Sequence, residues 1–246
     1  MSTLLAVRNV TKRFGGVVAN RAISLQIPRG EIVGLIGPNG SGKTTLFNSI
    51  AGNHSIDDGS VLFDGKEISH LRVAEIARLG IARTFQQTRV FANMNCLQNL
   101  LVSVPRGHEG LAALCRRPPA SVMARARDCL RFAGLQAREP DRAGNLSFGQ
   151  QKLLELAMAL MNEPSLLLLD EPTAGINPVM IHGMVDLLRR IQAQRGIALL
   201  VIEHNMQVIQ GLASYVYCLA NGALLAEGPP ERILADRSVI EAYLGV

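Results

Sequence analysis

Short apolar runs that end at a turn or at a charged residue recur along the chain. The three most apolar are Ile32–Ile36, Leu166–Leu169 and Ile197–Ile202, and each is shorter than eight residues. A run without alternating polar positions is typical of a strand buried on both faces, as in a parallel sheet covered by helices. Because a membrane-spanning helix needs about 20 apolar residues, these runs predict central parallel strands and no membrane span.

The N-terminal part of the chain predicts strands connected by tight turns. Leu4–Val10 and Ala22–Ile27 are apolar runs separated by glycine-containing turns. Gly59–Phe63, followed by Gly65, indicates a further short hairpin. These segments precede or interrupt the first buried strand, so we expect antiparallel strands at the N-terminal end of the fold.

Helices are predicted between the later strands. One follows a glycine-rich loop and runs from about Lys43 to Ile50, another covers about Val179–Gln194, and a third begins at Asn205. Two short strands around Asn221-Gly222 and two terminal helices complete the chain. Strands that alternate with helices indicate a mostly parallel sheet.

The middle of the chain has a different character. From about Gln86 to Gln150 the pattern is mostly helical, with a connection rich in proline and arginine at its centre. We therefore predict one α/β domain over residues 1–246. A helical subdomain is expected as an insertion over residues 88–162, and a helical tail over residues 229–246.

Composition restricts the class of protein. The chain has 246 residues, 48% of them apolar, and a mean hydropathy of +0.20. Since no apolar run is long enough for a membrane span, we assign the apolar surplus to buried strands. The first residues lack the features of a signal peptide, so the protein is expected to begin in the cytosol. The widely spaced cysteines are expected to be reduced, partly buried thiols; they are Cys96, Cys115, Cys129 and Cys218.

A phosphate-binding motif follows the first central strand. The segment GPNGSGKT over residues 37–44 fits the pattern GxxxxGK[ST], which this composition would produce by chance in about three of a thousand chains. Its glycines let backbone N–H groups converge on phosphate oxygens, and the following helix adds the positive end of its dipole. Lys43 is expected to neutralise the β- and γ-phosphates, and the Thr44 hydroxyl to bind Mg²⁺. The predicted nucleotide-binding residues are Gly37, Pro38, Asn39, Gly40, Ser41, Gly42, Lys43, Thr44 and Thr45.

Two acidic residues end the next central strand. The motif at residues 37–44 leaves kinases, GTPases and ATPases open, but Leu166–Leu169 is followed directly by Asp170 and Glu171. A buried parallel strand delivers both carboxylates to the edge of the sheet from which the phosphate loop also emerges. We expect Asp170 to hold Mg²⁺ through water and Glu171 to polarise the attacking water, which is typically worth about 10²–10⁴-fold in rate.

Three further segments carry a resemblance to a family. The segment LSFGQ over residues 146–150 resembles the LSGGQ signature of ABC-type ATPases, Gln86 matches their glutamine loop, and His204 matches their switch histidine. Within that family the chain is similar to the ATP-binding subunits of branched-chain amino-acid uptake systems. The segments that carry this similarity are Phe14–Gly16, Gly34–Gly40, Thr44–Asn48, Gly80–Gln86, Ala174–Asn177, Ile202–His204 and Val239–Gly245. The resemblance implies a P-loop NTPase core with an inserted helical signature subdomain.

The resemblance also implies catalytic roles. Glu171 would drive the cleavage of ATP, and His204 would steady the γ-phosphate and the attacking water. Gln86 would contribute to catalysis and, with Thr44 and Asp170, to the binding of Mg²⁺. ATP and Mg²⁺ are therefore the expected ligands.

Further contacts with the nucleotide follow from the same resemblance. Phe14 corresponds to the aromatic residue that stacks on adenine; the alternative is a phenylalanine of the core at a strand end. Ser147, Gly149 and Gln150 would contact a nucleotide bound mainly by an opposite subunit, so that ATP joins two subunits head to tail. Phe148 replaces the first glycine of the signature, which we expect to be tolerated.

The implied partners are proteins. They are membrane permease subunits, a second ABC ATPase subunit that is identical or paralogous, and indirectly a periplasmic binding protein, with the chain on the cytoplasmic face of the inner membrane. The helical insertion would receive a permease helix, and Arg89 and Phe91 are candidate anchors. For Phe91 the alternative is a place in the core of the subdomain.

Other functions remain open at this stage. The same kind of ATPase could serve another small polar solute, such as urea or amides. Lipopolysaccharide export is a further alternative, because Asn205 follows His204 where the amino-acid relatives usually carry Asp and a related lipopolysaccharide-export ATPase has Asn. An ABC ATPase that acts on nucleic acid is less favoured, since only about sixty residues separate Gln86 from Ser147 and the net charge of +5 is spread along the chain. No nucleic-acid partner is therefore expected.

Overall fold

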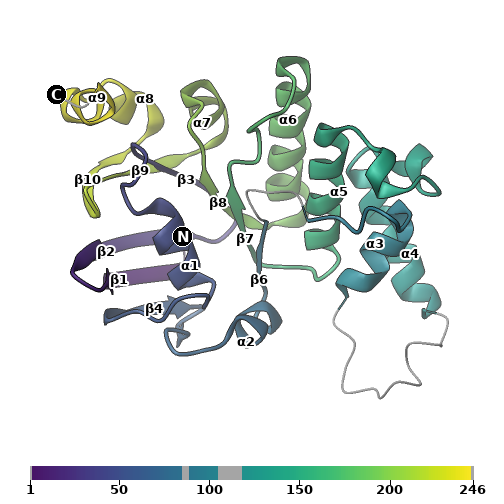
Figure 1. Ribbon diagram of the computed structural model, residues 1–246, viewed down its shortest axis with the longest axis horizontal. Coiled ribbons are helices and arrows are strands. Elements are labelled where there is room, and N and C mark those ends of the chain that lie inside the picture. The colour runs from purple at the N-terminus through teal and green to yellow at the C-terminus, as the bar shows by residue number, and fades with distance from the viewer. Residues whose placement is uncertain (1, 85–88, 105–117, 245–246) are drawn as a thin grey trace. The chain divides into compact units, whose positions relative to one another are not determined.

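The computed structural model describes residues 2–84, 89–104 and 118–244. The chain divides into two compact units, which are described separately (Figure 1). The core unit comprises Met1–Arg83, Ser165–Thr173 and Val185–Val246, and the helical unit comprises Thr84–Pro164 and Ala174–Met184.

The larger sheet of the core unit has six strands in the order β10-β9-β3-β8-β7-β6. Neighbouring strands are parallel except for the pair β9 and β10 at one edge. Their bounds are β3 (Ile32–Ile36), β6 (Ile81–Arg83), β7 (Leu166–Asp170), β8 (Ala198–Ile202), β9 (Tyr215–Ala220) and β10 (Ala223–Gly228). The prediction of a mostly parallel sheet is therefore confirmed.

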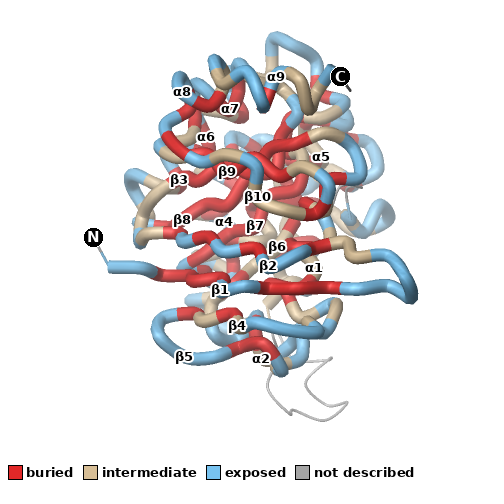
Figure 2. Tube along the Cα trace, turned by 90° about the vertical axis from the view of Figure 1, so that its left-hand side faces the viewer, coloured by how far each residue is buried: buried red, intermediate tan, exposed pale blue. Residues whose placement is uncertain are grey.

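The three most apolar runs form its centre. Every residue of β3, β7 and β8 is buried, as Figure 2 shows for β3 and β8. Ile202 at the end of β8 is in register with both Leu35 and Asp170. The three strands therefore leave the sheet at the same level, and the residues that follow them gather at one edge.

The second sheet is antiparallel and has the order β2-β1-β4-β5. Its strands are β1 (Thr3–Phe14), β2 (Val17–Pro28), β4 (Asp58–Phe63) and β5 (Lys66–Glu67). The predicted end of the first strand at Val10 was wrong. After an irregularity at Asn9, which has a φ of 49°, the strand continues to Phe14 opposite Val17. The polar residues between Val10 and Phe14 end the apolar run in the sequence. Backbone pairing between strands does not require apolar side chains, so the strand continues past them.

Helices connect the strands of the core unit largely as predicted. They are α1 (Lys43–Ile50), α2 (Val73–Arg78), α6 (Pro178–Arg195), α7 (Met206–Leu212), α8 (Pro230–Leu234) and α9 (Arg237–Leu244), with the beginning of α6 in the helical unit. Asn205 is the N-cap of α7 and accepts hydrogen bonds from two backbone N–H groups. The sequence pattern did not predict α2 and β6, because six and three residues are too short to show a period.

Apolar side chains fill both faces of the six-stranded sheet. One cluster joins the two sheets and α1, and includes Leu35, Phe47 and Leu168. The other lies under α7, α8 and α9, and includes Ile36 and Val239. Neighbouring residues of β3 thus point to opposite faces, as strand geometry requires. Both faces of β3 are apolar: one is buried against α1 and the antiparallel sheet, and the other against α7, α8 and α9.

The helical unit packs three helices together. They are α3 (Cys96–Ser103), α4 (Ala120–Phe132) and α5 (Phe148–Leu160), joined in part by short 3-10 turns at Gln136–Arg138 and Ala143–Asn145.

The described cysteines are free, buried thiols. Cys96 and Cys129 lie in the helical unit, and Cys218 lies in β9; Cys115 lies outside the described residues. No helix in the described part of the chain has the length and apolarity to cross a membrane.

Phe47→Ala tests the core between the two sheets. Phe47 is fully buried on α1, so removing the ring is expected to lower the free energy of unfolding by about 3–5 kcal/mol. Val17→Ala serves as the control, because Val17 is 67% exposed and its truncation should change stability by less than about 0.5 kcal/mol. Urea unfolding measures both variants, and equal losses would contradict this assignment of the core.

Candidate functional site

The phosphate loop connects β3 to α1 and depends on glycines at two closely packed positions. A Cβ on Gly37 would lie 2.1 Å from the carbonyl oxygen of Leu219, and one on Gly42 would lie 2.4 Å from that of Ala19. Both residues also have positive φ, of 144° and 99°. The loop is therefore held against the backbones of β9 and β2, and a side chain at either position would push it away.

Lys43 folds back over this loop. Its Nζ donates to the carbonyl oxygens of Gly37 at 2.8 Å and Pro38 at 2.9 Å, and lies 3.5 Å from Ser41 Oγ. Burial lowers the pKa of Lys43, while the nearby carboxylates of Glu171 and Asp170 oppose this shift. A buried ammonium group held by neutral carbonyls gains from an anionic partner, so the arrangement suits a phosphate group.

The rest of the motif lies at the surface or at the helix start. Asn39, Gly40 and Thr44 are exposed, and Thr45 is half-buried in the first turn of α1. No acidic residue lies in that turn, so the positive end of the helix dipole is uncompensated. Loop and helix start together offer a site for an anion.

Asp170, the last residue of β7, is 4% exposed and paired with Arg83 of β6. Arg83 Nη2 lies 3.2 Å from Asp170 Oδ2, and Nη1 donates to Asn48 Oδ1 of α1 at 2.5 Å. Burial raises the pKa of Asp170, and the Arg83 guanidinium counteracts that rise. The sequence analysis had given no role to Arg83, because nothing in its local pattern shows that β6 lies beside β7.

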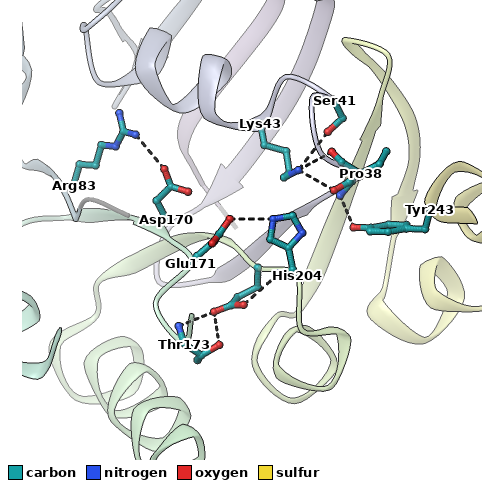
Figure 3. A network of polar contacts seen from close by, with 11 residues as sticks. Pro38, Ser41, Lys43, Arg83, Asp170, Glu171, Thr173, His204 and Tyr243 are labelled. Carbon is teal, nitrogen blue, oxygen red and sulfur yellow. Dashed lines mark hydrogen bonds and ion pairs between the residues drawn. The ribbon is translucent and has the colours of Figure 1, made fainter. Parts of the chain in front are cut away.

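Glu171 and His204, to which the resemblance assigned catalytic roles, lie beside each other. Glu171 Oε1 lies 3.0 Å from His204 Nε2, and Figure 3 shows the two side chains pointing toward each other. Glu171 has a φ of 51°, which is unusual for a residue with a side chain, and its N–H donates to Ile202 O at 2.9 Å. Backbone strain of this kind is concentrated at functional sites.

Glu203, a buried glutamate that the sequence analysis missed, connects the segment after Glu171 to the segment that contains His204. Glu203 is 3% exposed, and its Oε1 accepts hydrogen bonds from Thr173 N at 2.8 Å and Thr173 Oγ1 at 2.6 Å. Its Oε2 accepts from His204 N at 3.2 Å. The turn after Glu171 is therefore fixed to the start of the loop that carries His204.

Two residues distant in sequence hold the ends of the phosphate loop. Asn20 of β2 is fully buried and its Nδ2 donates to Gly42 O at 3.0 Å. At the other end, Gly37 N donates to the hydroxyl of Tyr243 in α9 at 2.7 Å. Sequence reasoning missed both contacts. Asn20 belongs to no motif, and Tyr243 lies in the segment Val239–Gly245 that carries the family resemblance, but no local pattern there shows that its hydroxyl meets the phosphate loop.

Phe14 lies at the end of β1 and is 46% exposed. Its ring meets that of His54 edge to face at a centroid distance of 5.3 Å, and Lys12 Nζ lies 5.3 Å from its centroid. The alternative of a core phenylalanine is therefore wrong. Stacking on adenine stays a prediction that the exposed ring permits.

The signature segment belongs to the helical unit. Ser147 is the N-cap of α5: its Oγ accepts from Gln150 N at 3.3 Å, and its own N–H donates to Gln150 Oε1 at 3.0 Å. A Cβ on Gly149 would lie 2.8 Å from Met180 Cε, while Phe148 is 45% exposed and packs over Gly175. The capping box leaves the Ser147 hydroxyl proton available to a ligand. Gln86 lies outside the described residues.

Phe91 is 53% exposed in the same unit, so its alternative as a core residue is wrong. Its N–H donates to Oδ1 of the buried Asn99 at 2.7 Å, which fixes the backbone beneath the exposed ring. The neighbouring Arg89 is also exposed. An anchoring role toward a permease stays a prediction.

Comparison with known proteins identifies the family. Residues 20–174 match the family model described as ABC transporter, and residues 223–246 match that described as branched-chain amino acid ATP-binding cassette transporter. The chain belongs to the ABC transporter family. It is 37% identical to the high-affinity branched-chain amino acid transport ATP-binding protein BraF of Pseudomonas aeruginosa, with 98% of each chain covered.

Solved structures agree with this result. An ATP-binding cassette of an ABC transporter in its ADP conformation matches with a TM-score of 0.91 and 34% identity over 100% of both chains. A dimeric ATP-binding cassette in a post-hydrolysis state, bound to ADP and Pi, matches with a TM-score of 0.76 and 26% identity. That match covers 92% of this chain and 99% of the other. The fold is that of an ABC ATPase cassette, and the chain is a nucleotide-binding protein.

Lys43→Ala tests the phosphate loop. The loss of charge-assisted contacts with phosphate is expected to weaken ATP binding by about tenfold or more. Lys66→Ala is the matched control, because Lys66 is exposed in β5. Titration with a fluorescent ATP analogue measures both dissociation constants, and equal affinity of Lys43→Ala and wild type would contradict the assignment.

Glu171→Gln tests the second half of the site. The variant keeps the shape of the side chain but cannot take a proton, so ATP binding is expected to persist while turnover falls by about 10²–10⁴-fold. A dimer should then accumulate with ATP on size-exclusion chromatography. Glu67→Gln, at an exposed position of β5, controls for the loss of charge. Unchanged turnover in Glu171→Gln would remove Glu171 from its role.

Proposed function

We propose that the chain is the ATP-hydrolysing subunit of an importer for branched-chain amino acids. One observation carries the activity: the carboxyl ends of β3, β7 and β8 bring Lys43, Asp170, Glu171 and His204 to one edge of a sheet. The comparisons carry the cargo, since residues 223–246 match the branched-chain model and BraF is named for the same transport.

In this proposal the phosphate loop binds the nucleotide. Lys43 exchanges its carbonyl partners for the β- and γ-phosphates. The N–H groups of the loop and of the α1 N-terminus donate hydrogen bonds to phosphate oxygens. The exposed ring of Phe14 stacks on adenine. These residues bind and orient ATP before any bond is broken.

The donor set also fits Mg²⁺. No three acidic, histidine or cysteine side chains among the described residues gather into a metal site, but Mg²⁺ characteristically uses one or two carboxylates together with phosphate oxygens and water. Thr44 and Asp170 would supply the protein oxygens, with Gln86 as the third candidate by resemblance. When bound, the ion neutralises charge on the β- and γ-phosphates.

Hydrolysis then requires a base and a group that holds the γ-phosphate. Glu171 takes a proton from the attacking water as the water oxygen bonds to the γ-phosphorus, and the bond to the leaving ADP oxygen breaks. His204, within one hydrogen bond of Glu171, steadies the γ-phosphate and the water. The products are ADP and inorganic phosphate.

Coupling to transport requires a second subunit. We infer a head-to-tail dimer in which Ser147, Gly149 and Gln150 of one subunit contact the γ-phosphate bound by the other; the dimeric cassette with ADP and Pi supports such an assembly for a relative. Because the γ-phosphate touches both subunits, its loss favours the open state. The partner is an identical or a paralogous ATPase.

The remaining partners are membrane permeases. A periplasmic binding protein supplies them with solute. The chain acts at the cytoplasmic face of the inner membrane. Phe91 and Arg89 are the proposed contacts with a permease helix, and the exposed ring of Phe91 supports this role. Asn205, the residue shared with a lipopolysaccharide-export relative, caps α7 with its Oδ1. Aspartate would cap the helix equally well, so Asn205 does not distinguish the cargo.

Deletion of the gene in its source organism tests the proposal. Uptake of radiolabelled leucine, isoleucine and valine is expected to be lost, to return with the wild-type gene, and not to return with Glu171→Gln, while urea uptake stays unchanged. Immunoblotting confirms equal amounts of both proteins. Normal leucine uptake in the deletion strain together with reduced urea uptake would overturn the proposed cargo.

A further inference from the structure

The C-terminal helix reaches the phosphate loop through one hydroxyl group. Gly37 N donates to Tyr243 Oη at 2.7 Å, a contact drawn in Figure 3. The Tyr243 ring packs against the apolar cluster that includes Ile36 and Val239. Burial raises the pKa of Tyr243 to about 12, so the group that receives the glycine N–H is a neutral phenol.

Gly37 is a position where such a contact has consequences. Glycine restricts its own backbone less than any other residue, and here no side chain is possible because a Cβ would lie 2.1 Å from Leu219 O. The conformation of Gly37 must therefore be restrained by its neighbours. Its carbonyl oxygen in turn accepts from Lys43 Nζ at 2.8 Å, so only one residue separates Tyr243 from the phosphate-binding lysine.

We propose that Tyr243 is a positioning residue for nucleotide binding: by holding the N–H of Gly37 it keeps the start of the phosphate loop, and with it Lys43, in the arrangement that receives ATP. Tyr243 acts through Gly37 and does not itself touch the nucleotide. The proposal rests on the proposed function in one respect, that the ligand of the loop is ATP. A restraint present before binding raises affinity because less order has to be imposed on binding.

A consequence concerns the C-terminal tail. Tyr243 lies within residues 223–246, the segment that matches the branched-chain family model, and in α9, which covers one face of the sheet. In this proposal the tail does more than complete the core: it contributes a group to the back of the nucleotide site. At the far end of the loop, the Asn20 Nδ2 group donates to Gly42 O. If Tyr243 lost its hydroxyl, the contact of Asn20 would be the one that remains of these two side-chain contacts at the ends of the loop.

The competing explanation is that Tyr243 only closes the apolar cluster, and Tyr217 supplies a matched control for it. Tyr217 belongs to the same unit and is 6% exposed. Its Oη accepts from Gln26 N at 3.1 Å and donates to Gln26 O at 3.3 Å. Tyr217→Phe therefore also removes a buried tyrosine hydroxyl that contacts the backbone, but this contact is with β2 and does not involve the phosphate loop.

The experiment compares wild type, Tyr243→Phe and Tyr217→Phe as full-length chains. Tyr243→Phe is expected to raise the dissociation constant for ATP about 3- to 10-fold, the equivalent of one hydrogen bond. Turnover at saturating ATP should stay within about twofold of wild type, because Glu171 and His204 are untouched. Tyr217→Phe should leave the ATP dissociation constant within about twofold, although thermal unfolding shows a similar loss of stability for both variants.

Amide hydrogen exchange of Gly37 without nucleotide provides a second measurement that does not depend on ATP. Exchange is expected to accelerate in Tyr243→Phe and not in Tyr217→Phe. Unchanged ATP affinity and Gly37 exchange in Tyr243→Phe, or an equal loss of affinity in both variants, would overturn the role of Tyr243. If instead the wild-type protein does not bind ATP, the proposed function fails, and the exchange measurement still decides whether Tyr243 holds the loop.

Discussion

The site depends on the register of three parallel strands that are buried on both faces. Ile202 lies opposite Leu35 and Asp170, so β3, β7 and β8 end at one level and deliver three different chemical groups to one edge. β3 leads to the phosphate loop, β7 to the acidic pair and β8 to Glu203 and His204. Burial on both faces fixes this register, because a shift of one residue would exchange the two apolar clusters on opposite sides of the sheet.

Charges at this edge are only partly hydrated, and the structure gives each of them a partner. Lys43 is held by carbonyl groups of its own loop, Asp170 by Arg83, and Glu203 by Thr173 and the backbone of His204. A buried charge without such partners would be strongly destabilising. The same contacts orient the groups before a ligand arrives, so stability of the fold and readiness of the site have a common physical origin.

The two units contribute different residues to the proposed function. The core unit contains the phosphate loop, the acidic pair and His204, whereas the helical unit contains the signature residues and the exposed Phe91. In the helical unit, Ser147 and Gln150 are already ordered by the capping box at the start of α5. In the proposed dimer, signature residues fixed by a helix cap would need little rearrangement to contact a nucleotide bound by the other subunit.

The sequence by itself determined the features that depend on local pattern. Uninterrupted apolar runs specified the central strands, the spacing of glycines with Lys43 specified the phosphate loop, and short motifs identified Asp170, Glu171 and His204. Only the tertiary structure decided that Arg83 pairs with Asp170, that Glu203 fixes the turn after Glu171, and that Asn20 and Tyr243 hold the ends of the loop. Those contacts join residues far apart in the chain, and they exist because strand order and helix packing bring the residues together, which no local pattern of residues encodes.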